Sequence, residues 1–275
     1  MQQQSRYLQE LLWILLIIAL LIVIAPIFWV ILGSFKTNTE IFGSPFSLPK
    51  SWNFDNMASA WVLGNFKMYF MNSTVITVLG MLIVLLVACP AGYVLAQIPF
   101  RGSKWMFYLF LFGMAIPVQA IIIPLFYQLK SIGLINTLTG VTLVSAGLAV
   151  PFSVFLIRNT FKDVPPEMRE AALIDGAEEW TTFFCVMLPM AKPGIVALMV
   201  FTFMQIWNDF LLPLVLLIDN SKFTVALGLH SLNVENSTNY GLVFGGTLIS
   251  MVPSIIVYLL FQRQFISGMA AGSGK

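Results

Sequence analysis

Long apolar runs separated by short polar segments dominate this chain. Six runs are long enough to cross roughly 30 Å of hydrocarbon as helices; they cover residues 11–33, 73–97, 105–127, 138–158, 194–218 and 240–262. Runs of this length with few charges are typical of membrane-spanning helices. The pattern predicts an all-α polytopic membrane protein, with six transmembrane helices that form a single transmembrane domain over residues 1–275.

The composition agrees with a chain whose solvent is the bilayer. Hydrophobic residues make up 59% of the sequence and charged residues only 9%, whereas soluble domains carry roughly 25% charged residues. The net charge of +2 is too small to indicate nucleic acid as a partner. Cys89 and Cys185 lie far apart in apolar surroundings, so we expect two small buried hydrophobes and no disulfide.

The basic residues predict which side of the membrane each loop occupies. With six spans, both termini lie on one side. Placing them in the cytoplasm puts nine of the 14 Lys and Arg residues inside and leaves five outside. Cytoplasmic loops carry an excess of Lys and Arg. The distribution therefore favours the orientation with the N-terminus and the C-terminus both inside.

The loop 159–193 is the one long polar segment on that inner side. Six of the chain's 12 acidic residues fall between Asp163 and Glu179. Pro165 and Pro166 favour a helix start, since proline fixes φ and the missing N–H has no helical partner there. Gly176 can then end the helix in a conformation with positive φ.

A second helix is predicted after that glycine. Apolar side chains recur at i, i+3, i+4 and i+7, which predicts one apolar face packed against the membrane helices; they are Trp180, Phe183, Phe184 and Met187. Small residues also recur every fourth position in the second run, at Ala88, Gly92 and Ala96. Such a stripe lets helix backbones approach closely in lipid. In the same run, Asn72 and Ser73 are expected to cap the helix at its start.

The loop's sequence resembles the EAA loop of ABC-importer permease subunits. That pattern has Glu-Ala-Ala, three residues, Gly, nine residues, an aliphatic residue, one residue and Leu-Pro. The matching positions here are Glu170, Ala171, Ala172, Gly176, Val186, Leu188 and Pro189. The resemblance implies a coupling helix that sits in a groove of an ATP-hydrolysing subunit. The residues implied in coupling are Glu170, Ala171, Ala172, Asp175, Gly176, Leu188 and Pro189.

Other segments resemble the permeases of maltose-type, binding-protein-dependent sugar importers. They include Ser34-Phe35-Lys36-Thr37, Ile116-Pro117-Val118-Gln119, Gly133-Leu134-Ile135-Asn136-Thr137 and Trp207-Asn208-Asp209-Phe210-Leu211. The resemblance implies an ABC importer type I permease fold in the bacterial plasma membrane. It also implies three kinds of protein partner: two ATP-binding subunits, a second homologous permease and an extracytoplasmic sugar-binding protein.

No catalytic, cofactor or metal site is expected in this chain. The phosphate-cradling pattern G-x-x-x-x-G-K-[ST] is missing from the sequence, so the resemblance assigns ATP and Mg²⁺ to the partner ATPase subunits. One histidine and two isolated cysteines form no metal-ligand pattern. The chain is therefore expected to be a non-catalytic permease.

Polar residues within the apolar runs are candidates for the substrate path. Asp209 is the acidic residue of the fifth run, with Asn208 beside it and Gln205 one turn earlier; Gln119 follows Pro117 in the third. A charge in lipid is costly, so Asp209 should face the bundle interior or water. Two roles remain open for these side chains: they hold helices together, or they line the path.

Two alternative functions are compatible with parts of this pattern. The same importer architecture could carry a polyol or a glycerol phosphate ester. A secondary transporter without ATP is the alternative from another class. It would need several ionisable residues within the spans for ion coupling, and the sequence offers Asp209 alone.

Overall fold

The computed structural model describes residues 2–235 and 239–272, and the side chains of residues 9–232 and 239–262. All regular secondary structure in this part of the chain is helical and no strand is present, as the apolar pattern predicts. Two compact units are present: Met1–Lys67 with Gly228–Val252, and Met68–Leu227 with Pro253–Lys275. Three helices have residues in both units: α4 (Phe66–Gln97), α13 (Val225–Glu235) and α14 (Tyr240–Gly272).

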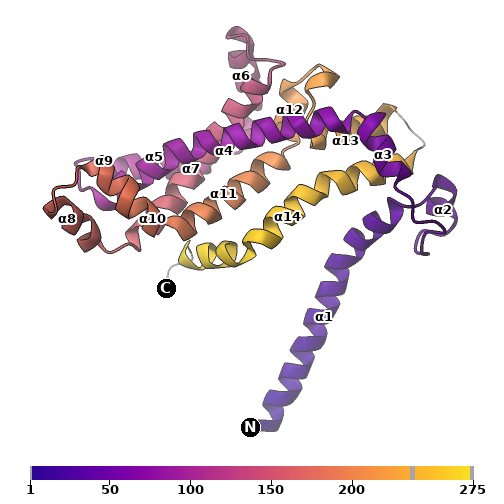
Figure 1. Ribbon diagram of the computed structural model, residues 1–275, viewed down its shortest axis with the longest axis horizontal. Helices are drawn as coiled ribbons and strands as arrows, with labels where there is room; N and C mark the ends of the chain where they lie inside the picture. The colour runs from indigo at the N-terminus through magenta and orange to yellow at the C-terminus, as the bar shows by residue number, and fades with distance from the viewer. Residues whose placement is uncertain (1, 236–238, 273–275) are drawn as a thin grey trace. The chain divides into compact units, whose positions relative to one another are not determined.

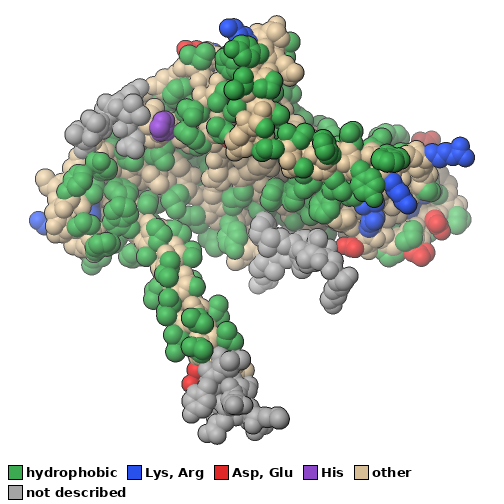
Figure 2. All heavy atoms as spheres, turned by 180° about the vertical axis from the view of Figure 1, so that it is seen from behind, with side chains coloured by type: hydrophobic (Ala, Val, Ile, Leu, Met, Phe, Trp, Pro, Cys, Tyr) green, Lys and Arg blue, Asp and Glu red, His purple; other side chains and the backbone are tan. Residues whose placement is uncertain are grey.

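Unit 1 begins with the long apolar helix α1 (Gln2–Gly33), followed by two short helices, α2 (Asn38–Gly43) and α3 (Asp55–Val62). Hydrophobic side chains cover the exposed surface of α1 (Figure 2), which suits a helix surrounded by lipid. The buried Lys36 ammonium donates to the carbonyls of Ser44 at 3.0 Å and Pro45 at 2.9 Å. These bonds fix the turn after α2, because a buried charge requires polar partners.

Unit 2 is built around α7 (Leu138–Lys162), which packs against α5 (Ser103–Met114), α11 (Lys192–Trp207) and α12 (Leu211–Leu216). The helices α4, α5, α7 and α11 run side by side, and α8 (Pro166–Ile174), α9 (Glu179–Thr182) and α10 (Leu188–Met190) lie together at one end of them (Figure 1). Lys and Arg side chains lie beside Asp and Glu at that end (Figure 2).

The small-residue stripe of α4 marks a close crossing with α7. Ala88 is fully buried, and a Cβ added at Gly92 would lie 2.7 Å from Ile157 Cγ2 and 2.9 Å from the backbone nitrogen of Arg158. The Arg158 side chain reinforces this crossing. Its Nε donates to the Leu95 carbonyl on α4 at 3.2 Å, and its guanidinium lies 3.9 Å from the ring centre of Phe107 on α5.

The predicted spans at 105–127 and 194–218 are not single continuous helices. The first range holds α5 and α6 (Val118–Ser131), which meet at 95°, because Pro117 is extended and has no N–H to continue a helix. In the second range α11 ends at Trp207 and α12 starts at Leu211. Four described helices are long and apolar enough to span a membrane, or up to six if two bent pairs each form one span: α5 with α6, and the segment Glu179–Met190 with α11.

The predicted cap at Asn72 and Ser73 is also wrong. Helix α4 begins at Phe66, so both residues lie inside it. The Asn72 amide donates to the carbonyls of Ser221 at 2.9 Å and Phe223 at 3.0 Å, and Ser73 Oγ accepts from the Val225 N–H at 2.9 Å. The two side chains therefore hold the loop after α12 against α4.

The contact at Gly92 gives a test of the α4–α7 crossing. We expect Gly92→Ala to destabilise the protein by roughly 1–3 kcal/mol, because the added methyl meets backbone that cannot move aside. The measurement is thermal unfolding of the purified protein in detergent. Gly147→Ala on α7 is the matched control, since nothing lies within 4 Å of its Cβ position. Equal unfolding temperatures for the two variants would show that the α4–α7 crossing tolerates a methyl group at Gly92.

Candidate functional site

The loop 159–193 folds into a short projecting helix, α8, followed by a second helical segment. Pro166 is the first residue of α8, as predicted, and Glu167 lies in the first turn, where negative charge is favourable. The helix has no buried residue. It is attached to α4 just before its start, where Gln97 Nε2 donates to the Val164 carbonyl at 3.0 Å.

Gly176 ends α8 in the predicted left-handed conformation, with φ +88°. Its N–H donates to the Leu173 carbonyl at 3.1 Å, and the Ala177 N–H donates to the Ala172 carbonyl at 3.0 Å. This pair of bonds is the Schellman pattern, which satisfies the last carbonyls of a helix. A Cβ at Gly176 would meet nothing within 4 Å, so the position requires glycine for its backbone angle.

Most of the residues implied in coupling lie on the surface. Ala172 and Leu188 are half-buried, and the exposed ones are Glu170, Ala171, Asp175, Gly176 and Pro189. Ile174 lies on the same side of α8 as Glu170 and is 85% exposed. An apolar side chain this exposed at a helix end is a candidate contact for another protein. The sequence pattern did not single it out.

A charged cluster fastens α8 to the rest of unit 2. Arg169 on α8 donates to both carboxylate oxygens of Glu179, from Nε at 2.9 Å and from Nη2 at 2.7 Å. The Tyr93 hydroxyl on α4 donates to the same carboxylate. The hydrogen bond to Glu179 raises the pKa of Arg169 above its ordinary value. The Tyr93 ring also packs on Phe161 and Phe183.

The second helical segment differs from the prediction of one apolar face. Phe183 and Met187 are buried, but Trp180 is 65% and Phe184 57% exposed. The segment forms two i,i+4 pairs, with Phe183 and Met187 buried and Trp180 and Phe184 exposed, and a π-helical turn runs over Phe183–Met187. Trp180 and Phe184 instead stack on each other, with ring centres 6.1 Å apart. The exposed Cys185 departs from its expected burial, whereas Cys89 is buried.

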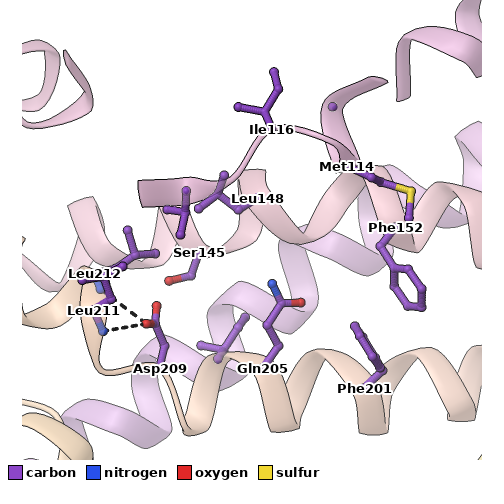
Figure 3. Close-up of a pocket in the computed structure, with 13 residues that line it drawn as sticks. Met114, Ile116, Ser145, Leu148, Phe152, Phe201, Gln205, Asp209, Leu211 and Leu212 are labelled. Atoms are coloured by element: carbon purple, nitrogen blue, oxygen red, sulfur yellow. Dashed lines mark hydrogen bonds between the residues drawn. The ribbon is translucent and has the colours of Figure 1, made fainter. Parts of the chain in front are cut away.

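Two of the four predicted path residues line a cavity of about 400 Å³ inside unit 2. Asp209 and Gln205 face it from the end of α11, and Ser145 faces it from α7 (Figure 3). Asp209 Oδ1 accepts the N–H groups of Leu211 at 3.0 Å and Leu212 at 3.3 Å. One carboxylate oxygen of Asp209 therefore accepts the first N–H groups of α12, and the same side chain borders the cavity.

The other two predicted path residues lie elsewhere. The Asn208 amide donates to the Met204 carbonyl at 2.9 Å and lies 3.4 Å from Ser254 Oγ on α14. This geometry agrees with a role in holding helices together. Gln119 is exposed on α6 and is not among the residues that line the cavity.

Several residues that build these sites carry no local sequence signal. Arg169 and Glu179 are ten positions apart and lie on separate helices, and Tyr93 is 86 positions from Glu179. Ser145 is one serine within an apolar run. Only the packing of α4, α8 and α9 and the packing of α7 against α11 bring these groups to their sites.

Comparison with known proteins agrees with this architecture. Residues 88–265 match the family model described as "Binding-protein-dependent transport system inner membrane component". The diacetylchitobiose uptake system permease protein NgcG of Streptomyces coelicolor is 41% identical over 94% of this chain and 86% of its own length. The arabinooligosaccharides transport system permease protein AraQ of Bacillus subtilis is 34% identical over 93% of this chain and 92% of its own.

A solved structure shares the fold over nearly the whole chain. It is a chain of a bacterial ABC transporter involved in the import of the acidic polysaccharide alginate, with 25% identity and a TM-score of 0.85. The match covers 95% of this chain and 98% of that one.

The apolar helices, the exposed EAA-type helix between them and the structural match together place this chain among the multi-pass membrane components of ABC importers. Within that class, the chain belongs to the family of binding-protein-dependent transport system inner membrane components.

The Arg169–Glu179 cluster gives a test of how α8 is held. We expect Glu179→Gln to speed amide hydrogen exchange in residues 166–174 about fivefold. A partly exposed, hydrogen-bonded ion pair contributes on the order of 1 kcal/mol. The measurement is hydrogen–deuterium exchange followed by mass spectrometry.

Asp219→Asn is the control for this test. It weakens another ion pair, in which Lys222 Nζ lies 3.2 Å from Asp219, and it should leave exchange in α8 unchanged. Unchanged exchange in Glu179→Gln as well would mean that other contacts hold α8.

Proposed function

We propose that this chain is a non-catalytic permease subunit of an ATP-driven importer for a sugar or oligosaccharide. The relatives above are named for the uptake of diacetylchitobiose and arabinooligosaccharides, and another, from Rhizobium radiobacter, is a lactose transport system permease. These names favour a sugar over a polyol or a glycerol phosphate ester.

One observation carries the coupling part of this proposal. Helix α8 has no buried residue, presents Glu170, Ala171 and Ile174 at the surface, and is closed by a glycine at φ +88°. It is nevertheless fastened to α4 through Glu179. A helix that is exposed yet fixed at its base can be pushed by another protein and pass the movement on to the helices behind it.

The proposed assembly contains partners that supply what this chain lacks. Two ATP-binding subunits hold ATP and Mg²⁺ and receive the coupling helices, a second homologous permease completes the pathway, and an extracytoplasmic binding protein delivers the sugar. The chain spans the membrane six times, with α5 and α6 as one span, α11 and α12 as another, and both termini in the cytoplasm. ATP binding draws the coupling helices together and opens the pathway outward, and hydrolysis resets it.

A secondary transporter is the competing class, and one experiment separates the two. A coupled importer subunit purifies with an ATPase and a second permease, whereas a secondary transporter moves sugar alone. Ion coupling would need several ionisable groups in the spans, and Asp209 is the acidic residue that lines the cavity.

Gly176→Pro tests the coupling helix directly. Proline requires φ near −65°, which is incompatible with +88°, and it also removes the N–H that bonds Leu173. We expect the variant to assemble but to lose most sugar-stimulated ATPase activity, measured in proteoliposomes with the binding protein. Glu170→Lys, which reverses an exposed charge, should cause the same loss.

Gly133→Pro is the matched control for this experiment. Gly133 has φ +73°, donates its N–H to the Lys130 carbonyl and has nothing within 4 Å of its Cβ position. The substitution introduces the same backbone conflict outside the coupling loop, so stimulation should persist. Full stimulation in Gly176→Pro and Glu170→Lys would contradict the proposal.

A further inference from the structure

The cavity in unit 2 contains polar groups that the fold does not use. Its volume of about 400 Å³ lies within the range of roughly 300–1,000 Å³ that is typical of small-molecule sites. Thirteen residues line the cavity; they come from α5, α6, α7, α11 and α12 and from the breaks between these helices. Most of them are apolar. The polar side chains Ser145, Gln205 and Asp209 gather at one part of the wall (Figure 3).

Ser145 is an unpartnered hydroxyl in this wall. The residue is 5% exposed, and its Oγ has no hydrogen-bond partner. Figure 3 shows the side chain pointing toward Asp209 across the cavity. A buried hydroxyl without a partner is costly, and natural proteins retain few of them. A ligand that exchanges a hydrogen bond with Ser145 would remove this cost.

Asp209 supplies a negatively charged hydrogen-bond acceptor beside that hydroxyl. Its Oδ1 is used by the N–H groups of Leu211 and Leu212, whereas Oδ2 is left for another donor. Within the described side chains, the ion pairs are Arg169–Glu179 and Lys222–Asp219, so no cation neutralises Asp209. A carboxylate in this position accepts hydroxyl or amide N–H groups and repels an anionic ligand.

The other end of the cavity is aromatic. Phe152 on α7 and Phe201 on α11 face each other with ring centres 4.2 Å apart and planes inclined by 32°. The amide of Gln205 lies between this pair and Asp209 (Figure 3). The cavity therefore runs from a polar end with donors and acceptors to an aromatic end that can pack on C–H groups.

We propose that this cavity binds one ring of a neutral sugar during passage through the permease. Ser145, Gln205 and Asp209 exchange hydrogen bonds with ring hydroxyl or acetamido groups, and the Phe152–Phe201 pair contacts C–H groups of the ring. The Asp209 carboxylate selects against sugars that carry a carboxylate. This inference rests on the proposed sugar-import function and adds to it a binding site within this subunit.

The test uses a cysteine reporter in the cavity wall. Leu148 lines the cavity and is given no role in binding, so Leu148→Cys serves as the reporter. The background carries Cys185→Ser, because Cys185 is exposed and Cys89 is buried. The assembled importer is labelled in detergent with a small methanethiosulfonate reagent. Probes are N,N′-diacetylchitobiose, lactose and dimannuronate, each raised to millimolar concentration.

We expect at least one neutral disaccharide to slow labelling of Leu148→Cys severalfold, and dimannuronate to leave it unchanged. Adding Ser145→Ala should raise the concentration for half-protection about fivefold, the effect of one lost hydrogen bond. Adding Asp209→Asn, which keeps an oxygen for Leu211 and Leu212, should make dimannuronate protective. If dimannuronate already protects the parent reporter, the selection by charge is overturned.

Met199→Cys is the matched control, because Met199 lines a second cavity of about 160 Å³ whose lining residues are all apolar. Its labelling should not respond to any sugar. Sugar-stimulated ATPase activity is measured in the same preparation with the binding protein. Intact stimulation with no protection of Leu148→Cys by any probe overturns the cavity proposal alone. If no sugar stimulates ATPase activity in the parent protein, the proposed function is overturned instead.

Discussion

The carboxylate of Glu179 is the interaction on which the working arrangement of unit 2 depends. It accepts hydrogen bonds from Arg169 on α8 and from Tyr93 on α4, and thereby joins a helix with no buried residue to a helix of the bundle. Tyr93 in turn packs on Phe161 at the end of α7. In the proposed coupling, movement of α8 would be passed to α4 and α7 together, because their close crossing at Gly92 leaves little space for independent motion.

The two broken helices have a related physical basis. Backbone that leaves a helix within the membrane is tolerated only where protein buries it or where it lines a cavity. The break between α5 and α6 places Ile116 and Val118 in the cavity wall, and the break after α11 places Asp209 and Leu211 there. The unpaired backbone is thus satisfied locally, as the bonds from Leu211 and Leu212 to Asp209 show. Such breaks commonly mark substrate sites in transporters.

Sequence patterns predicted the features that depend on neighbouring residues. The all-helical class, the start of α8 at Pro166 and its end at Gly176 follow from apolar run length, proline geometry and glycine's freedom at positive φ. Features that depend on distant packing were not predictable. Phe183 is buried whereas Trp180 is exposed, the cluster around Glu179 spans 86 positions, and the cavity places Ser145 opposite Asp209.

The most direct measurement is a crosslink from the exposed end of α8. A cysteine at Ile174, in a background with Cys185→Ser, is treated with a short homobifunctional thiol crosslinker in the assembled complex. The account predicts a crosslink to cysteines introduced around the surface groove of the ATP-binding subunit, with a yield that changes when ATP binds. Absence of any crosslink to that subunit, in a complex that still hydrolyses ATP in response to sugar, would contradict the account.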